Sequence, residues 1–146
     1  MMDFEKRVKE NIVRNEKYLS GFKKWLVKKG LANKTIKKHL SNTELFINDY
    51  LNYYDIVKSE DGLGDVFSFL NGWFIEKCLW SSRNSLKETT SSIKKFYEYM
   101  CENNFVDIDT FKKTFRFVKN NMDELLEKVD EFNNFDDYYN EYWKVR

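Results

Sequence analysis

The chain contains no proline and only five glycines among its 146 residues, and this scarcity of turn-forming residues limits the folds open to it. A β-sheet domain of this length needs many tight turns, and glycine and proline supply most of them. Helices joined by short loops need few such turns. Hydrophobic residues make up 42% of the chain, which is enough for one ordinary core. The composition therefore predicts a single all-α domain over residues 1–146.

Apolar residues recur at intervals of three and four, which is the spacing of one face of an α-helix. The pattern predicts a compact bundle of about five helices that ends in a long C-terminal helix. Whether the first dozen residues continue the first helix or form a separate arm is open, and two adjacent asparagines offer a point where the last helix could be interrupted. The expected helices cover about 3–29, 33–54, 65–77, 85–103 and 107 to the C-terminus, with Asn133 and Asn134 as that point of interruption.

Residues with known preferences for helix ends stand at several of these boundaries. Gly30 follows two lysines and suits a helix C-terminus, because glycine adopts a positive φ without strain. Asn33 is expected to cap the second helix and Asp65 the third, since their side chains can accept hydrogen bonds from free backbone amides. Ser85 begins a capping-box pattern for the fourth helix, and Ser82 could cap it equally well.

The charge is segregated along the chain. Eight lysines and no acid lie between Lys17 and Lys38, whereas residues 120–146 carry eight acids against three cations. The net charge of +1 is therefore the sum of opposed patches, and it does not exclude binding to a polyanion. The lysines span the end of the first expected helix and the start of the second, so we expect a basic corner that faces a polyanion, most plainly DNA.

Polar and cationic residues occupy the faces of the second and fourth helices that lie opposite their apolar stripes. Lysine neutralises phosphate and releases counterions, and each such contact steepens the salt dependence of binding. Few arginine, asparagine or glutamine side chains share these faces, which favours backbone contact over base recognition. A lysine-rich face that serves only solubility is the alternative. The residues on these two faces are Lys34, Lys37, Lys38, Ser41, Arg83, Lys87, Ser91, Lys94 and Lys95.

The sequence offers no candidate catalytic residue, metal ligand or cofactor site. His39 has no Cys or His partner at ligand spacing, so we expect it to flank the core or to add pH-dependent charge to the basic corner. Gly62 and Gly64 are not followed by the Gly-Lys-Ser/Thr of a phosphate-binding loop. We expect no enzyme activity, no cofactor and no bound metal.

The cellular location of the protein is predicted from the charge of the N-terminus and from the lengths of the apolar runs. No run approaches the roughly 18 apolar residues of a membrane span, and the charged N-terminus does not read as a signal peptide. Cys78 and Cys101 are then expected to be reduced thiols that serve packing. A cytoplasmic protein without membrane contact is the expectation.

Three short segments and the order of the helices resemble a known domain. The segments are Phe22-Lys23-Lys24-Trp25-Leu26, then Gly30-Leu31-Ala32 with Thr35-Ile36, and IKKFYEYM from Ile93 to Met100. Over about residues 15–107 the chain resembles the N-terminal, SAM-like core-binding domain of tyrosine recombinases, the phage-integrase type of enzyme. The resemblance implies a DNA-binding domain from a system of DNA integration and recombination, with the second and fourth helices crossing the major groove. The nine outward-facing residues of these helices, from Lys34 to Lys95, are then the candidate DNA-binding residues.

The sequence also departs from that family. Ala32-Asn33 stands where the family often has Ser-Pro, and no proline follows the fourth helix. The family's catalytic arginine, His-x-x-Arg pair and tyrosine nucleophile have no counterpart, since His39 is followed three residues later by Asn42. Tyr138, Tyr139 and Tyr142 are interpreted as helix-face aromatics. The resemblance thus implies a non-catalytic DNA-binding domain, and whether it derives from a truncated integrase or is an independent protein stays open.

Residues 108–146 are expected to form an acidic, aromatic C-terminal helix. It could cover the basic corner of its own chain or bind a second copy, and aromatic residues with few lysines suit an interface. Terminal helices exchange between subunits in the resembled family, which favours self-association. A helical protein–protein interaction or oligomerisation module is therefore the alternative function.

Overall fold

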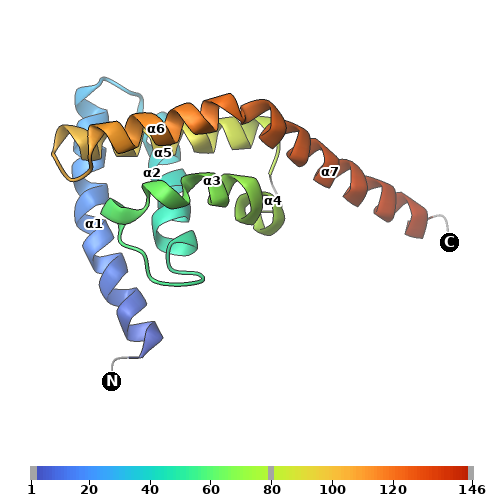
Figure 1. The fold of residues 1–146 in the computed structure, drawn as a ribbon, viewed down its shortest axis with the longest axis horizontal. Helices are drawn as coiled ribbons and strands as arrows, with labels where there is room; N and C mark the ends of the chain where they lie inside the picture. The colour runs from blue at the N-terminus through green and yellow to red at the C-terminus, as the bar shows by residue number, and fades with distance from the viewer. Residues whose placement is uncertain (1–2, 79–80, 145–146) are drawn as a thin grey trace.

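The computed structural model describes residues 3–78 and 81–144, with side chains described as far as residue 134. All regular structure in these residues is helical, and none of them lies in a β-strand, so the all-α fold class is confirmed. Figure 1 shows the arrangement. The elements are α1 (Phe4–Lys28), α2 (Asn33–Glu44), η1 (Leu45–Tyr50), η2 (Ser59–Asp61), η3 (Leu63–Asp65), α3 (Val66–Ser68), η4 (Phe69–Trp73), α4 (Phe74–Lys77), α5 (Arg83–Glu102), α6 (Ile108–Asn120) and α7 (Met122–Lys144).

The first helix ends at Lys28, and Gly30 terminates it in the way that the sequence predicts. Gly30 has a φ of 80°, its amide donates to the Val27 carbonyl at 3.0 Å, and the Leu31 amide donates to the Leu26 carbonyl at 3.5 Å. This pair of bonds satisfies carbonyls that a helix end leaves free, and it needs a left-handed residue at its centre. The first dozen residues continue α1 rather than forming an arm, because Asp3 caps it by accepting from the Lys6 amide at 2.7 Å.

The second and third expected helices form with modified geometry. The helix that begins with α2 widens into the π-helical turn η1, and the next one combines η3, α3, η4 and α4. The predicted cap at Asn33 is wrong, because Ala32 is the N-cap of α2 and Asn33 lies in the first turn. Asp65 stands at the N-cap position of α3, as predicted, but its side chain accepts no capping hydrogen bond.

The α5 helix begins at a capping box. The Ser82 hydroxyl accepts from the Ser85 amide at 3.1 Å, and the Ser85 hydroxyl accepts from the Ser82 amide at 2.7 Å. Ser82 is therefore the cap that the sequence left as one of two options. The helix ends where Asn104 takes a φ of 60°, a conformation that asparagine tolerates better than most residues.

The expectation of one helix from about residue 107 to the C-terminus is corrected. The helical chain breaks at Asn121, whose amide and side chain both donate to the Phe117 carbonyl, at 3.1 and 2.8 Å. The Asn121 carbonyl then accepts from the Leu125 amide at 3.1 Å, so this residue closes α6 and opens α7. The helix does not break at Asn133 and Asn134, which lie inside α7.

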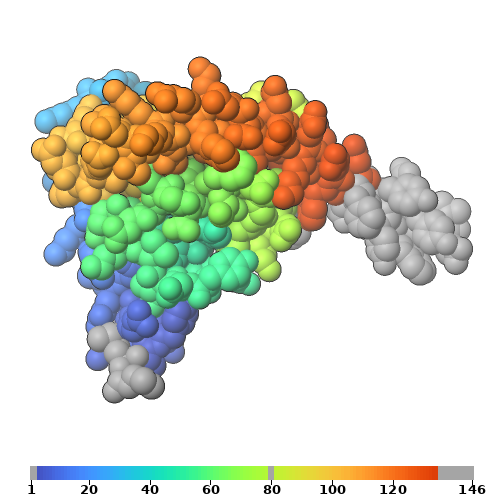
Figure 2. All heavy atoms as spheres, in the orientation of Figure 1, coloured from blue at the N-terminus to red at the C-terminus, as the bar shows by residue number. Residues whose placement is uncertain are grey.

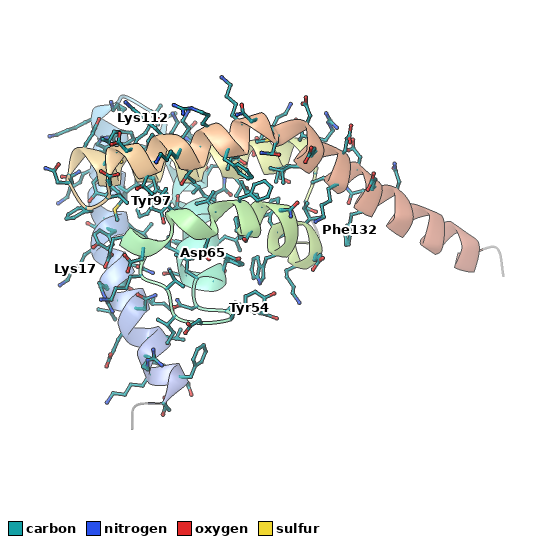
Figure 3. All side chains as sticks on the ribbon, in the orientation of Figure 1. Lys17, Tyr54, Asp65, Tyr97, Lys112 and Phe132 are labelled. Carbon is teal, nitrogen blue, oxygen red and sulfur yellow. The ribbon has the colours of Figure 1, made fainter. Side chains whose placement is uncertain are left out.

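One cluster of buried apolar side chains joins these helices. Tyr97 of α5 is fully buried, and its phenol donates to the Ser59 carbonyl at 2.8 Å. In Figure 3, Tyr97 points into the space between the helices, whereas Lys112 lies on the outer edge of α6. Figure 2 shows α6 and the start of α7 as one continuous ridge over the elements that follow α2.

A buried polar network fixes α1 against η1. The Asn15 side chain donates to the Ile47 carbonyl at 3.2 Å and to the Asn48 side chain at 2.9 Å. It also accepts from the Ser59 hydroxyl at 2.6 Å. The π-helical turn changes its own hydrogen-bonding pattern, and asparagine side chains bond to its carbonyls. This network orients α1, and with it the start of α2.

Candidate nucleic-acid interface

The helices α2 and α5, which carry the predicted DNA-binding residues, pack against each other through a polar contact. His39 Nδ1 lies 2.8 Å from the Ser92 hydroxyl, and the Asn42 side chain donates to the same hydroxyl at 3.0 Å. Ser92 in turn donates to the Glu88 carbonyl at 3.0 Å. The single proton of the Ser92 hydroxyl is already donated to the Glu88 carbonyl, so this hydroxyl can only accept from His39. The imidazole proton is therefore assigned to Nδ1.

The His39 imidazole is neutral at neutral pH. Burial lowers its pKa below 6.5, and the cations of Lys95 and Lys38 lower it further. The side chain is 9% exposed, so of its two expected roles it has the one of flanking the core. It links α2 to α5 without adding a third charge beside the two lysines.

The structure brings the nine predicted residues onto two neighbouring helices. All of them are exposed except Lys95, which is half-buried. Their positions match the faces that helical periodicity predicts, because the buried residues of both helices lie on the opposite sides. We call this the α2–α5 surface: Lys34, Lys37, Lys38, Ser41, Arg83, Lys87, Ser91, Lys94 and Lys95.

Two carboxylates reduce the positive charge of the α2–α5 surface. Lys38 Nζ lies 3.3 Å from Glu88 Oε1, and Arg83 Nη1 lies 2.6 Å from Asp130 Oδ2. Both pairs are about half exposed, so each contributes little to folding stability. Five of the seven cations have no ion-pair partner among the residues whose side chains are described: Lys34, Lys37, Lys87, Lys94 and Lys95.

The C-terminal half of α1 adds cations beside this surface. Lys23, Lys24 and Lys28 line a shallow surface hollow of about 560 Å³. Lys29 lies over the ring of Trp25 at 4.8 Å, and the indole of Trp25 donates a hydrogen bond to Glu102. The basic corner predicted from the sequence is therefore a feature of the surface.

Sequence reasoning missed a second group of cations. The helix α6 carries Lys112, Lys113, Arg116 and Lys119 against the single acid Asp109. Treating 108–146 as one acidic helix concealed them, because the acids of α7 outweigh them. The run from 110 to 122, which has four cations and no acid, was the signal that could have revealed them.

A groove of about 280 Å³ separates α5 from α6 and the start of α7. Its rim holds three lysines and two hydroxyl groups, and its floor is apolar. None of the described residues that line it carries a carboxylate. The lining residues are Lys87, Thr90, Ser91 and Lys94 of α5 with Phe115, Val118, Lys119 and Met122 from the other two helices.

Other chemistry finds little support in the described part of the chain. It contains no cluster of three or more His, Cys, Asp or Glu residues placed to hold a metal ion. Cys78 and Cys101 are free thiols, and burial raises the pKa of Cys78 to about 11, so this thiol stays protonated at neutral pH. The helices within 3–78 and 81–144 include none with the length and apolar character of a membrane span. Tyr138, Tyr139 and Tyr142 lie outside the described side chains.

Comparison of the chain with protein-family models, with curated proteins and with solved structures finds no match. The resemblance to the recombinase domain thus stays a prediction from short sequence segments. The charge and geometry of the α2–α5 surface are the remaining guide to function.

Proposed function

We propose that this protein is a non-catalytic DNA-binding domain, similar in use to the core-binding domain of phage-type integrases, and that duplex DNA lies across the α2–α5 surface. One observation carries the proposal. Two packed helices carry six lysines at exposed or half-buried positions, and most of them lack a carboxylate partner among the described side chains. The buried His39–Ser92 contact holds these two helices together beneath the lysines.

The charges on this surface predict how binding depends on salt. Each phosphate that a lysine neutralises adds roughly 0.9 to the slope of log affinity against log salt, so five contacts give a slope of about −4 to −5. Few arginine, asparagine or glutamine side chains share this surface to read bases, so its lysines are expected mainly to contact phosphates. We therefore expect strong salt dependence and weak preference among DNA sequences.

Fluorescence anisotropy with a labelled random-sequence duplex, at salt from about 50 to 200 mM, tests the proposal. The informative variant is Lys34→Glu/Lys37→Glu on α2, where both side chains are exposed. Lys6→Glu/Lys58→Glu is the matched control, because it changes net charge equally at exposed positions on α1 and in the loop before η2. The α2 variant should lose most of its affinity while the control loses little.

Two results overturn the proposal. One is the absence of binding by the unchanged protein at the lowest salt. The other is an equal loss of affinity in the α2 variant and the control, which would mean that only net charge matters. Circular dichroism of each variant confirms that the fold is intact.

Self-association as an interaction module is the second candidate, and the course of α7 favours it. The ribbon of α7 runs on beyond the bundle in Figure 1, and Phe132 is 42% exposed. Sedimentation of the whole chain against a chain ending at residue 134 tests this candidate, because Leu125 and Val129 upstream belong to the core and must stay. A whole chain that sediments as a monomer at high concentration removes the candidate.

A further inference from the structure

The groove between α5 and α6 is lined by three lysines and by no carboxylate of the described residues. Lys87 and Lys94 approach it from α5 and Lys119 from α6, and none of the three has an ion pair among the described side chains. Convergent lysines repel one another, and they gain favourable energy only when a negative group enters between them. The groove is thus built to receive an anion.

The rim also offers a neutral donor. No hydrogen-bond partner of the Ser91 hydroxyl is found within the described residues, so this hydroxyl can donate to a ligand oxygen. The Thr90 hydroxyl already donates to the Leu86 carbonyl at 2.7 Å and can only accept. Three ammonium groups and one free hydroxyl match the acceptor oxygens of a phosphate better than those of a neutral ligand.

The groove is continuous with the α2–α5 surface. Lys87, Ser91 and Lys94 belong to both, so an anion in the groove and a duplex on that surface would meet the same turns of α5. On the far side, α6 adds Arg116 one turn before Lys119, and Lys112 lies on the outer edge of the same helix in Figure 3. Cations therefore extend from α2 across α5 to α6.

We propose that the α5–α6 groove binds a phosphodiester group of the DNA backbone, and that the interface spans three helices rather than two. This inference rests on the proposed function and adds a binding site to it. An acidic peptide is the rival occupant. Continuity with the α2–α5 surface favours the phosphate, because one extended polyanion can contact both.

The anisotropy experiment above, with Arg116→Glu/Lys119→Glu added, tests the groove. Both side chains are exposed, so the fold should persist. We expect about a tenfold or greater loss of affinity at about 0.1 M salt and a salt slope shallower by about 2. The Lys6→Glu/Lys58→Glu control should keep the original slope.

Failure of the groove proposal can be distinguished from failure of the proposed function. A loss of affinity in the α2 variant together with control-like binding in the α6 variant overturns the groove and leaves the proposed function standing. Loss of neither, or no binding at all, overturns both. Polyglutamate and unlabelled duplex of equal total charge are then compared as competitors for bound DNA. Equal displacement by the two overturns the assignment of the groove to phosphate.

A second measurement does not depend on variants. Titration of ¹⁵N-labelled protein with duplex DNA should shift the amide resonances of Ser91 and Lys119 together with those of Lys34 and Lys37. Shifts confined to α2 and the distal face of α5 would overturn the groove as a contact.

Discussion

His39 on α2 and Ser92 on α5 share a hydrogen bond of 2.8 Å directly beside two lysines, Lys38 and Lys95. The contact is buried and neutral. It sets the distance between the two helices that carry the α2–α5 surface, so the relative placement of their cations depends on it. A cationic imidazole at this point would weaken the contact, because it would meet two ammonium charges in a partly dehydrated site.

Stability should therefore fall as the solution becomes acidic. The His39 pKa is lowered in the folded state, so the unfolded chain binds this proton more readily. The stability contributed by the neutral His39 is fully present above pH 6.5. It is lost as the pH falls from there through the folded-state pKa of His39. Urea unfolding at about pH 8 and about pH 5.5 should show the loss, and His39→Gln should reduce it.

The comparison with His39→Gln isolates the imidazole. Carboxyl groups whose pKa is raised by burial, such as those of Glu44 and Asp49, titrate in both proteins. The same loss of stability in the variant would show that other groups cause it.

Replacing Gly30 by alanine should destabilise the protein by about 1–2 kcal/mol, because its φ of 80° forces an L-residue into the left-handed region. Gly72→Ala is the matched control. A methyl group there would meet no atom within 4 Å, and the residue lies in the helical segment η4. The control should leave stability unchanged or raise it by up to about 1 kcal/mol. Thermal unfolding of both variants measures the two changes in stability. Equal changes would contradict the proposed role of Gly30.

Asn15→Ala should cost about 2–4 kcal/mol in the free energy of unfolding. It leaves the buried Ser59 hydroxyl without its acceptor and removes a donor from the Ile47 carbonyl. The exposed Asn33→Ala is the control, and we expect it to change stability by less than about 0.5 kcal/mol. Chemical denaturation measures both, and a small loss in Asn15→Ala would mean that water replaces the network.

Glu88→Gln should strengthen DNA binding by about 1.5- to 5-fold, since it frees Lys38 and removes a carboxylate from the α2–α5 surface. Glu5→Gln is matched to it, because it frees Lys9 from an exposed ion pair on the N-terminal half of α1. Anisotropy at constant salt should separate the two variants. An equal gain in both would attribute the effect to net charge.

Periodicity and turn chemistry account for most of the fold. The apolar spacing places α1, α2 and α5, and Gly30 marks the end of α1 because its backbone requirement is local. The break at Asn121 is not visible in the apolar pattern. The apolar repeat continues through it, and this one residue separates α6 from α7, with its amide and side chain bonded to the Phe117 carbonyl.

The candidate site was predictable in part. Helical faces put Lys34 and Lys94 in solvent, and the structure agrees. The partners of Lys38 and Arg83 could not be predicted, because Glu88 and Asp130 lie 50 and 47 residues further along the chain. Contact with DNA stays a prediction.

Asn121 has a consequence for the size of any bound polyanion. The charge of the chain changes sign at this residue, with cations preceding it on α6 and acids beginning at Asp123. A phosphate backbone following α6 would be attracted up to Asn121 and repelled beyond it. The footprint of a duplex should therefore have a sharp limit here, and the acidic part of α7 should lie outside the contact.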